Sequence, residues 1–225
     1  MIEGCFMDEK NNNVQEILND DFDYFKRWYD FNFNIEKYLS EQQRESFVLN
    51  DLSNVQKILL SDRRYSTSVR KELLEKLQLS TMIDYDIRMP IVRFVIDNLE
   101  SLKKAMVIAG AIFCHQDILK IISKKSLMAV IDQIGQEIYE FIVKRSMMLR
   151  KIIPDVSFNA RTNDMSEKIK SIGEQILCMS LIGLPYEIKK RLYLVIGKDL
   201  DIPEQGDAEV SKKCLELMTF ARDKI

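Results

Sequence analysis

The sequence predicts an all-α fold, and three observations carry that prediction. Seven glycines and four prolines in 225 residues are too few for the many turns of an all-β sandwich. Leucine, isoleucine, lysine and glutamate are abundant, which favours helices. Apolar residues recur at helical spacing along most of the chain, and no stretch alternates as a strand does. With 46% hydrophobic residues the chain can bury a sizeable core, so we expect a bundle-like domain.

The N-terminal part combines a polar start with an aromatic segment. Residues 1–13 are polar and aperiodic, so we predict a flexible tail there. From Val14 onward, apolar residues fall at helical spacing and lead into residues 22–33, which hold seven of the twenty aromatic residues. Asn32 and Asn34 favour caps and turns, so we expect them to interrupt this first helix.

The later helices are predicted from apolar stripes and from end signals. Pro90 suits the first turn of a helix, and Gly183 and Gly197 suit the ends of two others. Ser126 heads one long apolar face that runs to Ile142. Loops are expected near 155–164 and 199–207, inside a single helical domain over residues 14–225. We predict helices over residues 48–60, 69–77, 90–99, 99–113, 117–122, 126–142, 169–181, 185–195 and 210–221.

Charge is distributed unevenly along the chain. Residues 1–60 hold 12 acidic and 6 basic side chains, whereas residues 61–198 hold 23 basic and 16 acidic ones. A basic middle suits nucleic acid, an anionic membrane or an acidic protein. The longest basic run is Lys189-Lys190-Arg191, and no aromatic residues interleave it as base stacking requires. Solvated helix faces are therefore the favoured interpretation, and we expect no nucleic acid among the partners.

The residues that could carry chemistry form no recognisable site. Four cysteines, the first at position 5, make no CxxC pair and no spacing typical of zinc. We expect Cys114, Cys178 and Cys214 to be reduced and buried, as in the cytosol. Cys114 and the adjacent His115 project about 100° apart on a helix, so they cannot act as nucleophile and base. We predict a core thiol beside a histidine at the rim, and no catalytic, cofactor or metal site.

Two further features concern acid–base chemistry and membrane insertion. Asp84 and Asp86 flank a tyrosine, and a solvated loop or helix cap explains them better than an acid–base pair. The longest strongly apolar stretch, residues 105–113, is far shorter than the roughly 20 residues that span a bilayer, and no secretory signal is evident. We therefore expect a soluble, cytoplasmic protein that is not an enzyme.

The aromatic segment permits both a core and an interface interpretation. On a helix, Phe22, Phe25 and Tyr29 share one face, while Trp28 and Phe31 face elsewhere. One helix buries aromatic rings on two faces only if it is central or contacts a partner. Tryptophan and tyrosine are frequent interface anchors. We assign most of these rings to the core and keep Trp28 as the residue to test at an interface.

Three stretches of the chain carry recognisable motifs. Phe31-Asn32 is followed at a fixed spacing by Tyr38-Leu39, and residues 99–149 hold Gly110-Ala111 in a leucine-rich helix. Later, Leu184-Pro185 precedes Lys190-Arg191-Leu192. In this order the three stretches resemble the N-terminal signature, the central block and the C-terminal stretch of the K-type accessory proteins of the sorting platform in bacterial type III secretion systems.

The resemblance implies an all-helical cytoplasmic adaptor without enzymatic activity, peripherally associated with the injectisome at the inner membrane. Its implied partners are the cytoplasmic face of the inner-membrane ring and the C-ring-like pod protein, with no direct membrane insertion. A type III secretion chaperone or a helical regulatory binding module remains the alternative. The candidate protein-binding residues are Trp28, Tyr29, Lys189, Lys190 and Arg191.

Overall fold

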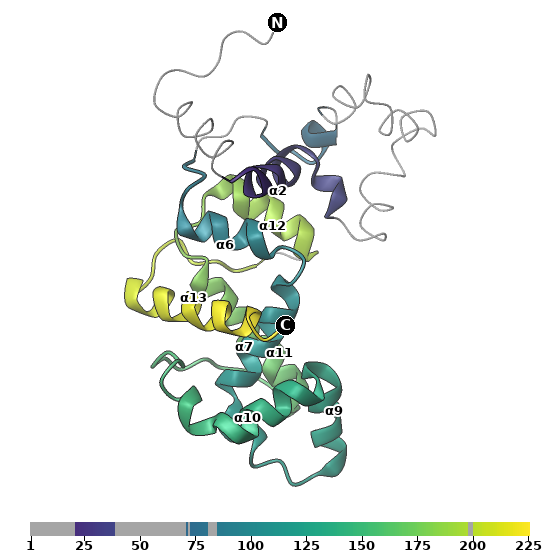
Figure 1. Cartoon of the computed structure of the whole chain (residues 1–225), viewed down its shortest axis with the longest axis vertical. Helices are drawn as coiled ribbons and strands as arrows, with labels where there is room; N and C mark the ends of the chain where they lie inside the picture. The colour runs from purple at the N-terminus through teal and green to yellow at the C-terminus, as the bar shows by residue number, and fades with distance from the viewer. Residues whose placement is uncertain (1–20, 39–70, 72, 81–84, 198–199) are drawn as a thin grey trace, which may run out of the picture. The chain divides into compact units, whose positions relative to one another are not determined.

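The computed structural model describes residues 21–38, 71, 73–80, 85–197 and 200–225. Within these ranges every regular element is a helix and none is a strand, which confirms the all-α class (Figure 1). No helix in the described ranges is long and apolar enough to cross a membrane. The predicted tail over 1–13 and helix over 48–60 lie outside the described residues, as does part of 69–77.

The chain divides into two compact units. Unit 1 takes its residues from 1–99 and 184–199, and unit 2 takes its residues from 100–183 and 200–225. The chain therefore passes from unit 1 to unit 2, returns, and passes to unit 2 again. The single helical domain over 14–225 remains a prediction.

Unit 1 is built around the aromatic segment. Its first helix begins after Asp21, whose carboxylate accepts a hydrogen bond from the backbone N of Tyr24 at 3.0 Å. The predicted interruption is confirmed at Asn34 but wrong at Asn32, which stays inside the helix because its amide donates to the Trp28 carbonyl at 2.8 Å. The helices of unit 1 that lie wholly within the described residues are α2 (Phe22–Phe33), the 3₁₀ helix η1 (Ile35–Lys37), α6 (Pro90–Asn98) and α12 (Tyr186–Ile196).

Unit 2 contains the longest of the helices that the structure describes. Asp164 and Asp207 cap two of them, because each side chain accepts a hydrogen bond from a backbone N–H of the first turn. Its described helices are α7 (Leu102–Phe113), α8 (His115–Ile118), α9 (Lys124–Ile134), α10 (Gln136–Leu149), α11 (Met165–Ser180) and α13 (Ala208–Arg222).

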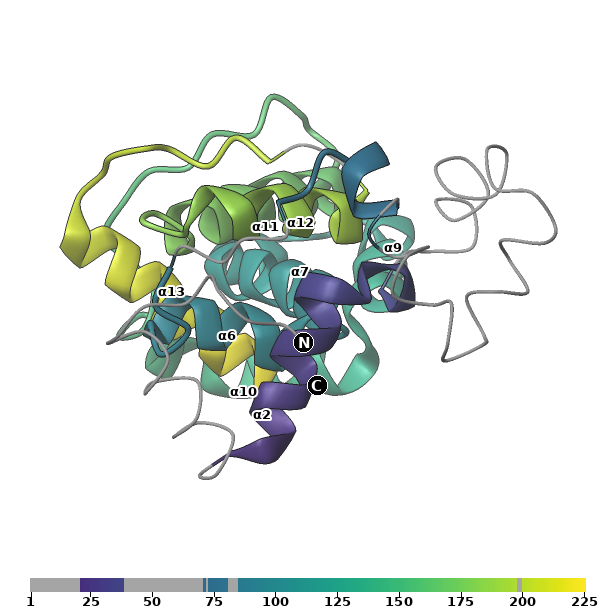
Figure 2. The same cartoon turned by 90° about the horizontal axis from the view of Figure 1, so that it is seen from above.

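The core of unit 2 is the packing of α7 against α11, with α13 across both (Figures 1 and 2). Two glycines make the closest approach possible. A Cβ on Gly110 would lie 2.9 Å from the backbone N of Gly173 and closer still to the carbonyl oxygen of Ile169. A Cβ on Gly173 would in turn press on the backbone carbonyl of Met106. The two helices therefore touch backbone to backbone at this point, and no side chain fits between them.

Two predictions for unit 2 are wrong in detail. The long apolar face from Ser126 to Ile142 is broken at Gly135, where φ is 91°, so it becomes the two helices α9 and α10. The helix over 117–122 ends at Ile118 instead, and Ile122 lies 99% exposed.

The Cys114–His115 pair also differs from the prediction. His115 is buried, not at a rim, and its Nδ1 lies 3.1 Å from the carbonyl oxygen of Ile112. Cys114 and Cys214 are buried free thiols, as predicted, whereas Cys178 is only partly buried. These thiols can therefore be distinguished by their reactivity.

Among these three thiols, labelling should follow exposure, with the partly buried Cys178 reacting before Cys114 and Cys214. Burial raises the pKa of the Cys114 and Cys214 thiols to about 11, and the thiolate is the reactive form. Because a thiol stays protonated below its pKa, both should resist a maleimide even at about pH 9. Peptide mass mapping of the native protein should find Cys178 modified first. Equal labelling rates at the three positions would contradict this burial pattern.

Candidate functional site

The helix α2 has two aromatic faces, one buried in unit 1 and the other exposed. Tyr24, Trp28 and Phe31 are buried in unit 1. On the other face Phe22 is 62% exposed and Tyr29 is 46% exposed. Helical spacing divides the rings between the same two faces as the structure does. The face that continues the apolar pattern from Val14, however, is the exposed one.

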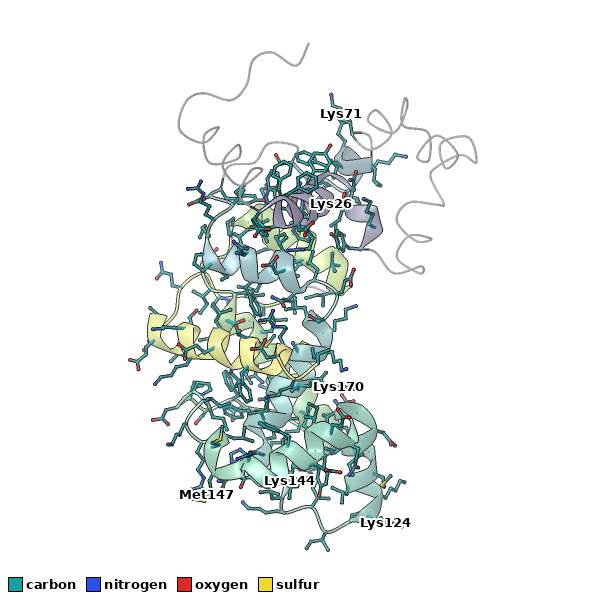
Figure 3. All side chains as sticks on the ribbon, in the orientation of Figure 1. Lys26, Lys71, Lys124, Lys144, Met147 and Lys170 are labelled. Atoms are coloured by element: carbon teal, nitrogen blue, oxygen red, sulfur yellow. The ribbon has the colours of Figure 1, made fainter. Side chains whose placement is uncertain are left out.

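The outward face forms a continuous row of rings. The ring centroids of Phe25 and Tyr29 lie 6.4 Å apart, and those of Tyr29 and Phe33 lie 5.0 Å apart, within the range of favourable aromatic pairs. Phe22 precedes this row on the same face. We call these four residues, Phe22, Phe25, Tyr29 and Phe33, the aromatic ladder. Lys26, which Figure 3 labels on α2, is exposed within the same helix.

Beneath the ladder a buried hydrogen-bond network fixes α2. The indole N–H of Trp28 donates to the hydroxyl of Tyr85 at 3.2 Å, and that hydroxyl donates to the side-chain oxygen of Asn32 at 2.9 Å. Burial raises the pKa of Tyr85 to about 12, although the hydrogen bonds with Trp28 and Asn32 act in the opposite direction. The network therefore holds a neutral phenol that serves as donor and acceptor at once.

Arg191 of α12 completes this network from the other side. It is 1% exposed, and one guanidinium nitrogen donates to the carbonyls of Ser80 at 2.6 Å and Asn32 at 3.3 Å. The other nitrogen donates to the carboxylate of Glu187 at 3.3 Å. Burial lowers the pKa of Arg191, while Tyr85 and Glu187 raise it. Arg191 thus joins α12, α2 and the segment before Tyr85.

A second set of contacts joins α2 to α6 at the surface. Arg27 pairs with Asp97 at 2.8 Å, and Arg93 pairs with Asp21 and lies 4.9 Å from the ring centroid of Tyr24. Exposed ion pairs contribute little individually, about 0–1 kcal/mol. Their value here is geometric, because they fix the direction of α2 and hence of the ladder.

The five predicted binding residues therefore differ in their surroundings. Tyr29 is exposed in the ladder, and Lys189 and Lys190 are partly exposed on α12, where Lys190 donates to the carbonyl of Gln78. Trp28 and Arg191 are buried and share one network through Asn32. Binding of a partner by any of the five remains a prediction, and the structure gives Trp28 and Arg191 a role inside unit 1.

Four residues of the ladder and the network were not among the predicted binding residues: Phe22, Phe33, Asn32 and Tyr85. The two phenylalanines follow from helical spacing once the outward face is known. Neither the expected helix interruption at Asn32 nor the position of Tyr85 indicated that the two would bond to each other, because a buried polar network depends on contacts between distant segments.

The described residues offer little to a metal or to acid–base chemistry. Among them no group of three or more His, Cys, Asp or Glu side chains is placed to hold a metal ion. Asp86 accepts a hydrogen bond from the backbone N of Arg88 at 2.8 Å, which suits the predicted turn, and Asp84 lies outside the described residues. A rigid aromatic surface is the feature of unit 1 that suits recognition.

Comparison with known proteins gives one match. The model of the family described as YOP proteins translocation protein K (YscK) matches residues 27–213, which is most of the chain. No curated protein and no solved structure matches. The matched range contains Trp28, Tyr29 and Phe33 of α2 and all of α12, so it includes the buried network.

Proposed function

This chain belongs to the YscK family of type III secretion proteins, and from that premise we propose that it is a non-enzymatic structural adaptor of the sorting platform. The adaptor links the cytoplasmic face of the inner-membrane ring to the C-ring-like pod protein, and secretion of effectors depends on it. Its place is the cytoplasmic side of the inner membrane, at the injectisome. The family is a structural component of the secretion system, which supports this proposal.

The observation that carries the proposal furthest is the aromatic ladder. Exposed aromatic rings dominate the energetics of protein interfaces, because each buries a large area with few rotatable bonds. The network beneath the ladder fixes α2 before any partner arrives. A surface that is already ordered loses little conformational entropy on binding. We therefore assign to the ladder the contact with one of the two partners, the ring or the pod protein.

Substitution of the ladder should break that contact without unfolding the protein. We expect the double variant Phe22→Ser/Tyr29→Ala to weaken binding of one partner by about 30-fold, as loss of interface anchors worth about 2 kcal/mol does. Binding of purified protein to the ring's cytoplasmic domain and to the pod protein, measured separately, tests this. Tyr186→Ala is the matched control, since Tyr186 is a 70% exposed aromatic on α12 outside the ladder.

Two results decide between the proposed roles: one concerns the ladder, and the other separates the adaptor from the secretion chaperone. Unchanged binding of both partners by the ladder variant would remove the ladder from the interface. Affinity purification of the chain from cells with and without the ring tests the adaptor role itself. Recovery of a secreted substrate in place of the ring and pod proteins would favour a secretion chaperone.

A further inference from the structure

The connection between α8 and α9 carries the most exposed large apolar side chain among the described residues. Residues 119–125 read Leu-Lys-Ile-Ile-Ser-Lys-Lys, and we call them the lysine tip. Ile122 is almost fully exposed at its centre, and Leu119 is exposed beside it. Single exposed apolar side chains are common at protein surfaces, so the exposure of Ile122 becomes informative only together with the charge around it.

The backbone holds Ile122 outward. On one side the N–H of Ile121 donates to the carbonyl of Ile118 at 3.2 Å, and Ile118 is buried. On the other side Ser123 caps α9, because its hydroxyl accepts a hydrogen bond from the backbone N of Ser126 at 3.4 Å. Ile122 stands between these two hydrogen-bonded turns, so its side chain has no route into the core of unit 2.

The surroundings of Ile122 are positively charged. Lys120, Lys124 and Lys125 are exposed, and the sequence has no acidic residue from 118 to 131. The carboxylate before this stretch, Asp117, is shared: it pairs with Lys168 at 2.8 Å and with Lys120 at 4.0 Å. Lys124 and Lys125 form no ion pair with any other residue that the structure describes.

We propose that the lysine tip is a peripheral docking site for an anionic lipid bilayer. Lysines are depleted at protein interfaces, where aromatic residues and arginine are enriched, and the tip has three lysines and neither of the other kinds. Anionic headgroups attract lysines near the membrane surface, and long lysine stems let the ammonium groups stay at the headgroups while an aliphatic side chain enters the boundary layer. Ile122 is that side chain. The contact lies in the interface and spans nothing.

The same end of unit 2 extends the surface. The helix α10 packs against α8 and α9, and Figure 3 places Lys144 and Met147 at this end together with Lys124. Met147 is highly exposed, whereas Lys144 is paired with Glu140 at 2.9 Å. Lys144 is therefore neutralised by its partner, whereas Lys124 and Lys125 lie close to Ile122 in the chain, so the tip is where we test substitutions.

Vesicle flotation of the purified full chain tests the proposal without any secretion partner. We expect binding to vesicles of equal parts phosphatidylglycerol and phosphatidylcholine, and none to phosphatidylcholine alone or at high salt. Ile122→Asp should reduce binding at least tenfold, and Ile122→Leu should retain it. Lys124→Ser/Lys125→Ser should also reduce binding by about tenfold or more. All variants should melt as the wild type does, because these side chains are exposed.

The control is another pair of adjacent exposed lysines in unit 2. Lys103→Ser/Lys104→Ser on α7 removes the same charge and should change binding less than twofold. Absence of vesicle binding by the wild type, or equal losses in the tip and control variants, would overturn the proposal. So would vesicle-independent binding of an acidic secretion protein that Lys124→Ser/Lys125→Ser abolishes. Because the assay lacks the ring and pod proteins, its result is independent of the adaptor role.

Discussion

Replacement of Arg191 by leucine should lower the free energy of unfolding of unit 1 by about 3 kcal/mol or more. The guanidinium donates to the carbonyl of Asn32 in the last turn of α2 and to the carbonyl of Ser80. Each buried carbonyl that loses its donor costs about 1–3 kcal/mol. The last turn of α2 has no basic residue of its own, so Arg191 supplies from α12 the positive charge that a helix C-terminus favours.

Trp28 makes this result measurable, because it is the only tryptophan and lies in the same network. Its fluorescence during urea unfolding should show the midpoint shifted down for Arg191→Leu. Lys189→Glu is the matched control, since Lys189 precedes Arg191 on α12 and is partly exposed, and its effect should stay within about 0.5 kcal/mol. If Arg191 served a partner instead, Arg191→Leu would weaken binding while its unfolding curve matched the wild type.

Gly110→Ala should lower the stability of unit 2 more than the addition of a single methyl group elsewhere in that unit. The new Cβ meets backbone atoms of α11, which cannot rotate away as a side chain can, so α7 and α11 must separate. Overpacking of this kind typically costs about 1–3 kcal/mol, and the better helix propensity of alanine returns about 1 kcal/mol. Because the clash is with backbone, the cost should lie at the upper end of that range, so we expect a net loss of about 2 kcal/mol, seen as a melting temperature about 4–8 °C lower by circular dichroism.

The reciprocal contact adds a sharper expectation. Gly173→Ala should behave in the same way, and the double variant should lose less than the sum of the single losses, because one separation of the helices accommodates both methyl groups. Lys170→Ala, on the exposed side of α11, is the control and should change stability by less than about 0.5 kcal/mol. Additive losses would show that the glycines do not share one contact.

The sequence predicted the features that depend on local chemistry. Pro90 starts α6, Gly197 ends α12 in the left-handed conformation, and α11 and α13 lie where their apolar stripes indicated. These signals are local, because a missing N–H or a positive φ acts on the residue that carries it. The all-α class followed for the same reason.

The errors concern choices that only tertiary contacts make. Helical spacing showed that Phe22 and Tyr29 share a face, but not that Tyr24 and Trp28 form the buried one. Gly135 was read as part of a helix, since a helix interior tolerates glycine at a cost of about 1 kcal/mol. The apolar pattern indicated a helix through Ile122, whereas the helix ends at Ile118, because hydrophobicity does not determine where a turn points a side chain.

The way Arg191 joins unit 1 bears on how the protein is made. Its partners Asn32 and Ser80 lie 159 and 111 positions earlier in the chain. A ribosome therefore releases α2 and α6, and then most of unit 2, before the residue that completes unit 1 emerges. Unit 2 waits longer still, because α13 follows α12 in the chain. A premature stop codon after Gly183 would thus remove α12 from unit 1 and α13 from unit 2, so a single truncation would leave both units incomplete.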